Sequence, residues 1–248
     1  MSGTKVQLCG RFVAQIDGHR FDTTLPGRQG RMLFAFLVLN RERPVGRAEL
    51  IEALWAQNLP RKPADTLAAL LSKVRSVVGE QYLPGRANVE LTLPADADID
   101  VEEAIAAIHD AESACAMADW PRAWGSALAA QIVARRTLLV EFEAEWIDEW
   151  RRELESILLR SLECYSRACL GIGGTESAGA ERSARALIRL APLRESGYGL
   201  LMAALEAEGN AAEALSIYDE LRTVLRDELG TAPGAATQTI YLRLLGTN

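Results

Sequence analysis

The side chains best suited to chemistry in this 248-residue chain lie on one side of the segment Pro63–Val78. Turning an α-helix by about 100° per residue places on that side Lys62, Asp65, Ala69, Ser72, Lys73 and Ser76. A helix with small and cationic side chains fits the major groove of DNA, because small residues allow close approach while lysine and arginine meet phosphates. An ordinary solvated helix face has the same composition, and this alternative stays open on the pattern alone.

Two helices are predicted to position that face. Arg47–Trp55 carries its apolar residues on one side, as an amphipathic helix does. In Pro63–Val78, leucine and valine recur at steps of three and four, which predicts a stripe that faces a core. Pro63 suits the first helical position, and Gly79 suits a left-handed helix end. A short loop that contains proline joins the two helices.

The rest of the first 95 residues predicts a small α+β domain. Val6–Phe21 alternates apolar and polar residues around the turn Asp17-Gly18, which is typical of a β-hairpin. A helix is predicted over Arg28–Asn40, and a second hairpin, or wing, over Tyr82–Leu93. Pro94–Asp100 is predicted to be a short acidic link, and we place the domain boundary there.

From Val101 onward the sequence shows helical patterns and no strand pattern. The predicted helices cover about 101–117, 120–135, 143–170, 178–190, 195–208, 211–229 and 234–245. Small residues at Ala204, Ala211 and Ala214 allow close helix packing, which is typical of stacked tetratricopeptide-type units. Trp146 and Trp150 lie four residues apart and favour a packing stripe, with a ligand or peptide groove as the alternative.

Motifs of catalysis and of nucleotide or metal binding are missing from the sequence. There is no Gly-x-x-x-x-Gly-Lys-Ser/Thr loop, no His-Glu-x-x-His pair and no Gly-x-Ser-x-Gly elbow. The four cysteines lack Cys-x-x-Cys spacing and are expected to be buried free thiols. We therefore predict that the chain is not an enzyme and has no catalytic residues, no cofactor and no metal site.

Composition and charge predict a soluble protein with two unlike halves. Residues 1–95 hold 13 Lys and Arg against 8 Asp and Glu, whereas residues 96–248 hold 14 against 26. A DNA duplex would attract the first half and repel the second, although chance variation between two globular domains gives the same asymmetry. The sequence has no apolar run of membrane-spanning length and no signal peptide, so we expect a cytoplasmic protein without membrane contact.

Taken together, these motifs resemble the Streptomyces antibiotic regulatory proteins. The N-terminal resemblance lies in Leu50, Ile51, Leu54 and Trp55, then Ser72, Lys73, Val74, Arg75, Val78 and Gly79. The bacterial transcriptional activator domain of that family is matched by Asp98-Ile99-Asp100, Pro192-Leu193-Arg194-Glu195, Leu201-Met202, Ala211–Leu215 with Tyr218, and Asp227–Gly230 followed by Pro233. The resemblance implies an α+β winged helix of OmpR/PhoB type over residues 1–95 and an all-α, tetratricopeptide-like activator domain over residues 96–248.

The resemblance also implies a function. The chain is expected to be a sequence-specific DNA-binding transcriptional activator of a secondary-metabolite or similar gene cluster. It would bind direct repeats in double-stranded DNA, with a homodimer on the DNA, and recruit RNA polymerase. The candidate DNA contacts are Arg28, Arg31, Arg61, Lys62, Asp65, Thr66, Ala69, Ser72, Lys73, Arg75, Ser76 and Arg86. Arg61 and Lys62 lie in the Gln57–Lys62 loop, which can touch RNA polymerase in related winged helices.

Two alternatives remain from the sequence. Leu70 and the altered wing favour an adaptor or antagonist that keeps the fold, binds DNA weakly and acts through protein or ligand contacts. In that case Lys73→Ala and Arg75→Ala would leave activity intact. A weaker alternative is a regulator that senses a small molecule in its helical domain.

Overall fold

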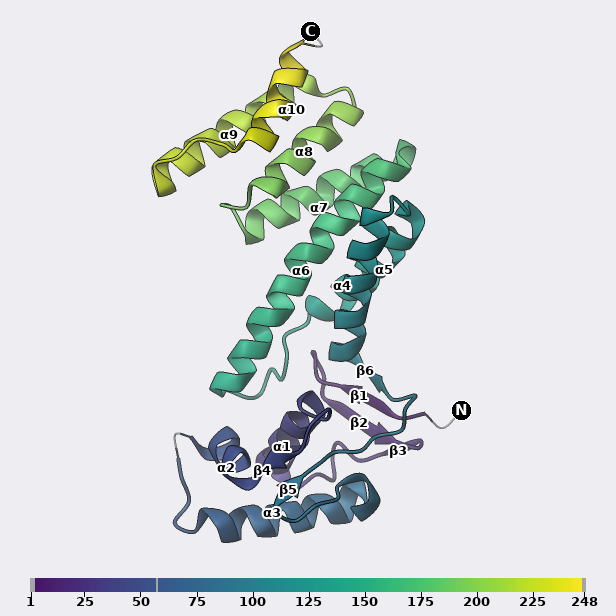
Figure 1. Cartoon of the computed structure of the whole chain (residues 1–248), viewed down its shortest axis with the longest axis vertical. Helices are drawn as coiled ribbons and strands as arrows, with labels where there is room; N and C mark the ends of the chain where they lie inside the picture. The colour runs from purple at the N-terminus through teal and green to yellow at the C-terminus, as the bar shows by residue number, and fades with distance from the viewer. Residues whose placement is uncertain (1–2, 57, 247–248) are drawn as a thin grey trace. The chain divides into compact units, whose positions relative to one another are not determined.

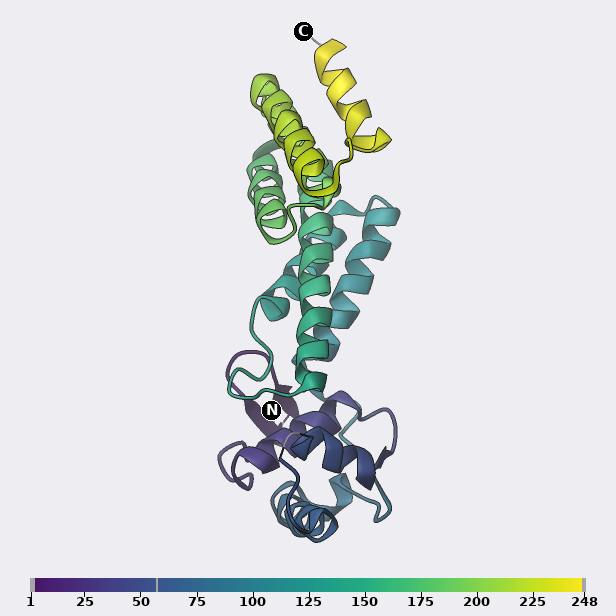
Figure 2. The same ribbon diagram turned by 90° about the vertical axis from the view of Figure 1, so that its left-hand side faces the viewer.

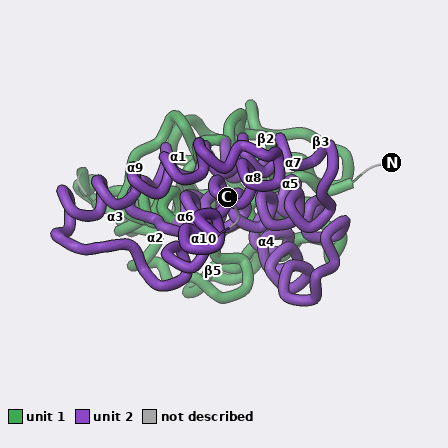
Figure 3. The backbone as a smooth tube through the Cα atoms, turned by 90° about the horizontal axis from the view of Figure 1, so that it is seen from above, with its two compact units in different colours: residues 1–103, 136–152 green, residues 104–135, 153–248 purple. Residues whose placement is uncertain are grey.

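The computed structural model describes residues 3–56 and 58–246, and the described residues form two compact units (Figures 1 and 3). Unit 1 consists of residues 1–103 and 136–152, and unit 2 of residues 104–135 and 153–248. Gln57, the first residue of the predicted loop, lies outside the described residues.

Unit 1 contains a four-stranded sheet in the order β3-β2-β1-β6. Its strands are β1 (Lys5–Gln7), β2 (Val13–Ile16), β3 (His19–Arg20) and β6 (Asp98–Ile99). The predicted Asp17-Gly18 turn joins β2 to β3, and both residues have the positive φ that such a tight turn requires. The predicted acidic link Pro94–Asp100 ends in a strand that the sequence analysis did not predict, because β6 pairs in parallel with β1 and buries Ile99.

Three helices pack together in the same unit. They are α1 (Gly27–Leu39), α2 (Arg47–Trp55) and α3 (Pro63–Val78), each within one residue of its predicted bounds. Leu33, Leu50 and Leu67 are fully buried between them. After the 3-10 turn η1 (Glu80–Tyr82), strand β5 (Asn88–Val89) pairs with β4 (Val45–Gly46).

A buried carboxylate ties the sheet to the first helix of the second half, α4 (Asp100–Ala116). The Asp100 oxygens accept the backbone N–H groups of Leu8 at 3.0 Å, Cys9 at 2.8 Å and Val101 at 2.9 Å. Burial raises the pKa of Asp100, and the three backbone hydrogen bonds act in the opposite direction. The last residue of the Asp98-Ile99-Asp100 motif therefore has a structural role, because it satisfies three backbone donors at once.

A returning segment, Arg136–Arg152, completes unit 1. Leu138, Leu139 and Phe142 are buried in it, and the Leu139 N–H donates to the Leu8 carbonyl at 2.9 Å. Arg151 holds the segment in place because its guanidinium donates to the carbonyls of Leu138, Leu139 and Phe142. Residues 1–95 are thus packed against a segment that follows them by more than 40 residues.

Unit 2 is helical over its described residues. Besides most of α4, it contains α5 (Trp120–Ala134), most of α6 (Glu145–Ile172), η2 (Gly174–Glu176), α7 (Ser177–Leu190), α8 (Glu195–Ala207), α9 (Ala211–Leu229) and α10 (Ala235–Gly246). The seven predicted helices are confirmed, with ends displaced by two residues at most. Successive helices from α7 to α10 pack on one another (Figures 1 and 2).

The core of this helical array combines large residues with alanines. Tyr198, Leu201 and Leu221 are buried between α8 and α9, and the rings of Tyr218 and Tyr241 stack at 4.1 Å. Ala204, one of the predicted small residues, is fully buried against α6 and α7. The small side chain allows the close helix approach that the sequence predicted.

Among the described residues, no helix is both long and apolar enough to cross a membrane. The prediction for the cysteines is confirmed for three thiols. Cys9, Cys164 and Cys169 are buried and unpaired, while Cys115 is half-buried. Burial raises the pKa of the Cys164 thiol to about 12, so this thiol stays protonated and unreactive near neutral pH.

A glycine near the end of α6 leads to a prediction for unit 2. A Cβ added at Gly171 would collide with the indole ring of Trp120. We expect Gly171→Ala to lower the free energy of unfolding by about 2 kcal/mol or more, because α5 and α6 must move apart to make room for the added methyl group.

Gly125→Ala on α5 is the matched control, since nothing lies within 4 Å of its added Cβ. Gain of helix propensity should make the control neutral or stabilising by up to about 1 kcal/mol. Equal thermal stability of the two variants would contradict this packing argument.

Candidate nucleic-acid interface

One face of α3 is open to solvent within unit 1. Leu67, Leu71, Val74 and Val78 are buried, whereas the other side of the helix is exposed. The exposed residues are Asp65, Thr66, Ala69, Ser72, Lys73 and Ser76. The predicted division of the helix into a core stripe and an outward face is therefore present, and the outward face carries small and polar side chains over about three turns.

A depression runs along this face, between α3 and the start of α1. It is lined by Pro26, Gly27, Gln29, Trp55, Lys62, Asp65, Thr66, Ala69, Leu70 and Lys73. The residue that precedes α1 is Pro26, which offers no side-chain acceptor, and the first turn contains no acidic residue. Such a helix start favours anions, because its N–H groups and dipole are positive. With Lys62 and Lys73 beside it, the depression suits a phosphate.

Hydroxyl groups on the face are fixed by the helix itself. Thr66 donates its hydroxyl hydrogen to the Lys62 carbonyl at 2.8 Å, and Ser76 donates to the Lys73 carbonyl at 2.8 Å. Their oxygens keep free lone pairs that can accept hydrogen bonds from a ligand. Arg61 and Lys62 are exposed at the end of the preceding loop, where Leu59 is also exposed.

Arg75 holds the hairpin that follows α3. Its Nε donates to the Leu83 carbonyl at 2.9 Å, and one Nη donates to the Gly85 carbonyl. The hairpin is closed by bonds from Thr92 N–H to the Tyr82 carbonyl and from Glu90 N–H to the Pro84 carbonyl. At its tip Arg86 is exposed, and its carbonyl accepts from Arg47 at 2.9 Å. In the structure the Arg75 guanidinium therefore positions this hairpin, and its predicted contact with a phosphate stays a prediction.

That geometry predicts a specific effect of Arg75→Lys. Lysine keeps the charge but lacks the planar fork that reaches two carbonyls. We expect amide hydrogen exchange at Glu90 and Thr92 to become about 10- to 100-fold faster, because hydrogen bonds from a charged donor contribute about 1.5–3 kcal/mol. Lys73→Arg, on the exposed face, serves as the control and should leave exchange unchanged. Unchanged protection in Arg75→Lys would show that the hairpin does not depend on the guanidinium.

The two arginines at the start of α1 lie against the returning segment. Their guanidinium groups sit over the Phe142 ring, at 5.1 Å for Arg28 and 5.7 Å for Arg31. Arg31 also pairs with Glu141 at 3.1 Å. Sequence reasoning missed Phe142, although an aromatic residue within an acidic run was a visible signal. Arg31 is therefore partly neutralised, while Arg28 stays exposed.

Comparison with known proteins bears on the other half of the chain. Residues 96–245 match the family described as Bacterial transcriptional activator domain. The chain belongs to this family. The predicted resemblance to the Streptomyces antibiotic regulatory proteins is thereby confirmed, and relatives of that type match most of the chain. The family match begins after the candidate interface, so it supports none of the DNA contacts directly.

Two curated relatives extend across the candidate interface. Regulatory protein AfsR of Streptomyces griseus is 29% identical over 228 residues, which are 88% of this chain and 22% of AfsR. Transcriptional regulatory protein EmbR of Mycobacterium tuberculosis is 26% identical over 249 residues, which are 96% of this chain and 62% of EmbR. The chain thus spans only part of the length of these transcriptional regulators.

A solved structure shares the fold. Mycobacterium tuberculosis EmbR in complex with a low affinity phosphopeptide aligns with a TM-score of 0.84 and 22% identity, covering 99% of this chain and 65% of that one. The small N-terminal sheet and the mostly helical remainder are therefore shared with EmbR.

Proposed function

We propose that the chain is a sequence-specific DNA-binding transcriptional activator. Residues 1–95 would act as an OmpR/PhoB-type winged helix and residues 96–248 as a tetratricopeptide-like activator domain. The observation that carries the proposal is the exposed, leucine-poor face of α3 beside Lys62, Lys73 and the uncapped start of α1. The family match and the regulator relatives support the same function.

The spacing of the two lysines suits a duplex. Lys62, the residue that precedes α3, and Lys73 within it are 11 residues apart, which corresponds to about 16 Å along the axis at 1.5 Å per residue. The major groove is about 12 Å wide, so side chains at these positions reach phosphates on both of its strands. Lys62 and Lys73 are thus proposed to set the position of α3 on the DNA backbone.

Bases would be read by the residues between the lysines. Asp65 can accept a hydrogen bond from a cytosine amino group, Ala69 can contact a thymine methyl group, and Ser72 can bond to either kind of base edge. All three are exposed. Thr66 and Ser76 offer hydroxyl acceptors at the two ends of the face.

The remaining candidate residues would contribute less to DNA binding or would contact another partner. Arg86 would contact phosphate from the hairpin tip that Arg75 holds in place. Arg28 is exposed at the rim of the interface, and Arg31 contributes less because Glu141 pairs with it. With Leu59, which is 63% exposed, Arg61 forms a patch suited to RNA polymerase.

Few residues on this face read bases strongly, because Arg, Asn and Gln are missing from it. We therefore propose that two protomers bind side by side on direct repeats and that paired binding supplies the affinity. Repeats spaced by about one helical turn would present the same groove face to both protomers.

Footprinting on the region upstream of the neighbouring gene cluster tests the proposal. We expect protection of two direct repeats, with a single repeat protected only at much higher protein concentration. Ala69→Asp should abolish protection, since it places a carboxylate against the groove, whereas Glu80→Ala outside the face should not. Absence of any protected sequence would instead favour an adaptor that acts through protein contacts.

A further inference from the structure

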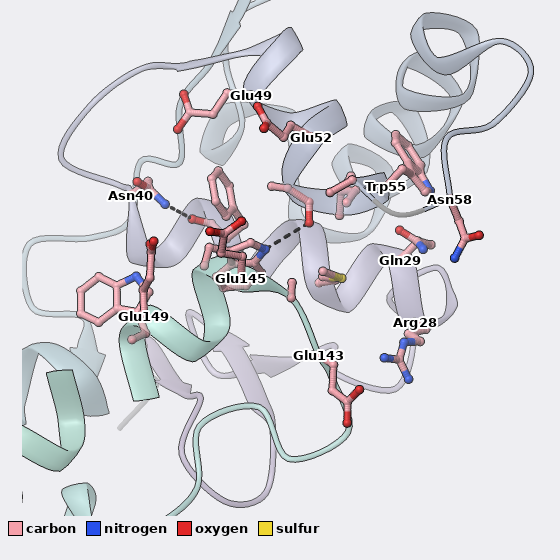
Figure 4. A pocket seen from close by; sticks show the side chains of 18 of the residues that line it. Arg28, Gln29, Asn40, Glu49, Glu52, Trp55, Asn58, Glu143, Glu145 and Glu149 are labelled. Atoms are coloured by element: carbon pink, nitrogen blue, oxygen red, sulfur yellow. Dashed lines mark hydrogen bonds between the residues drawn. The ribbon is translucent and has the colours of Figure 1, made fainter. Parts of the chain in front are cut away.

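Unit 1 contains a second hollow, distinct from the depression along α3. It is a cleft of about 580 Å³ between α1, α2 and the first turns of α6 (Figure 4). This volume lies in the range of small-molecule sites. The cleft is formed largely by α1 and α2, and the returning segment closes it.

Aromatic side chains form fixed walls in the cleft. The Trp146 ring meets the Phe36 ring edge to face at 5.1 Å, and its indole N–H donates to the Ala53 carbonyl at 3.1 Å. Trp150, one helical turn further along α6, also lines the cleft, as does Met32. Because Trp146 is held by both a ring contact and a hydrogen bond, this wall is in place before any ligand arrives.

Carboxylates surround these walls. Figure 4 shows Glu49 and Glu52 from α2, and Glu143, Glu145 and Glu149 from the returning segment. Glu49 pairs with Arg43. The other four carboxylates form no ion pair with any residue in the described part of the chain. Arg28 also lines the cleft, so five carboxylates stand against two guanidinium groups, and the cleft carries net negative charge.

A buried acceptor without a partner also lines the cleft. The side-chain oxygen of Gln29 is inaccessible to solvent and accepts no hydrogen bond from the described residues. Buried polar atoms are nearly always hydrogen-bonded, so this oxygen indicates a missing donor. Gln29 also lines the depression along α3, so this oxygen does not assign a ligand to either hollow.

We propose that the cleft binds a small organic cation, with an ammonium or guanidinium group on an apolar body. The carboxylates balance its charge, and the aromatic walls attract it through cation–π contact. An anion would be repelled, and a neutral apolar molecule would leave the negative charge of the cleft unbalanced. Binding to this cleft does not depend on the proposed DNA contacts.

Titration with paired probes tests this assignment. Nα-Acetyl-L-argininamide and spermidine serve as cations. Nα-Acetyl-L-citrullinamide serves as the neutral isostere of the first, because its α-amino group is blocked and its ureido group carries no charge. The indole N–H resonances of Trp146 and Trp150, assigned with Trp→Phe variants, report on the cleft. We expect saturable shifts of these two resonances with both cations and little change with citrullinamide.

Variants separate specific binding from general attraction to an acidic protein. Glu145→Gln/Glu149→Gln should weaken binding of argininamide about 10-fold or more, because two charges that face the ligand are removed. Glu153→Gln/Glu155→Gln, which lies further along α6 outside the lining of the cleft, removes the same charge and should change the affinity less than about twofold.

Three results would overturn the proposal. The first is an equal response to argininamide and citrullinamide, and the second is an equal loss of affinity in the two double variants. The third is saturable binding of a basic peptide in the cleft while both small cations fail to bind, which would make the cleft a protein-docking surface.

Discussion

Replacement of both Lys62 and Lys73 by alanine is expected to weaken binding of each protomer to its repeat about 30-fold at 0.15 M salt. Each lysine that neutralises a phosphate releases about one counterion, and at this salt concentration each release is worth roughly fivefold in affinity. Both side chains are exposed and line the depression beside the start of α1, so their loss should leave the fold unchanged. Fluorescence anisotropy with a labelled duplex measures the change.

The matched control removes the same charge elsewhere in unit 1. Arg11 and Arg152 are exposed and are not part of the candidate interface. Arg11→Ala/Arg152→Ala should reduce affinity less than threefold or so, because charges beyond a Debye length are largely screened. If the control weakens binding as much as the lysine pair does, the attraction is a property of net charge and α3 has no special role.

Replacement of Asp100 by alanine is expected to lower the free energy of unfolding of unit 1 by about 3–5 kcal/mol. The carboxylate is 7% exposed and accepts three backbone N–H groups, which would lose their partner in a site closed to water. Urea denaturation followed by hydrogen exchange at the Leu8 and Cys9 amides measures the loss. Unit 2 should keep its protection, because the affected residues belong to unit 1.

Asp98 provides the control for this prediction. It lies two residues away, on β6, and pairs with Lys5 at 2.8 Å on the surface. Asp98→Ala should cost less than about 1 kcal/mol, since exposed ion pairs contribute little. Equal destabilisation by the two alanine variants would mean that Asp100 does not anchor β1.

The helices could be predicted from sequence because the residues that determine each helix lie close together in the sequence. The burial of Leu67, Leu71 and Val74 in α3 follows directly from their spacing of three and four residues, and the exposed face is what remains. The tight turn at Asp17-Gly18 could be predicted for the same reason, since both residues take the positive φ angles that their residue types favour.

Long-range contacts could not be predicted in this way. Strand β6 has only two residues, Asp98 and Ile99, and its partner β1 lies more than 90 residues earlier. The return of Arg136–Arg152 to unit 1 depends on buried contacts of Leu138 and Phe142 with that unit, which have no periodic signal.

The role of Arg75 shows the same limit at the candidate interface. Helical spacing places it at the flank of the exposed face, which is consistent with a phosphate contact. Its actual hydrogen-bond partners are the Leu83 and Gly85 carbonyls, whose position is set by the fold of the hairpin. Spacing predicts which side of a helix a residue occupies, but the partner of a long side chain depends on neighbouring segments.

The distribution of charge along the sequence predicted only part of the charge of unit 1. Residues 1–95 are basic as a group, but unit 1 also contains the acidic residues of the returning segment, such as Glu143, Glu145 and Glu149. The proposed DNA binding would therefore depend on the local cations around α3 and not on the charge of the whole unit.

The most direct test of the central proposal is a titration of the full chain against a direct-repeat duplex at salt concentrations from 0.05 to about 0.3 M. If Lys62, Lys73 and Arg86 of each protomer contact phosphate, a plot of log K against log salt should fall linearly, with a slope of about −5 for two protomers. The slope should become shallower by about 4 in Lys62→Ala/Lys73→Ala. A flat plot for the unmodified protein, or an unchanged slope in the double variant, would contradict the proposal that α3 binds DNA.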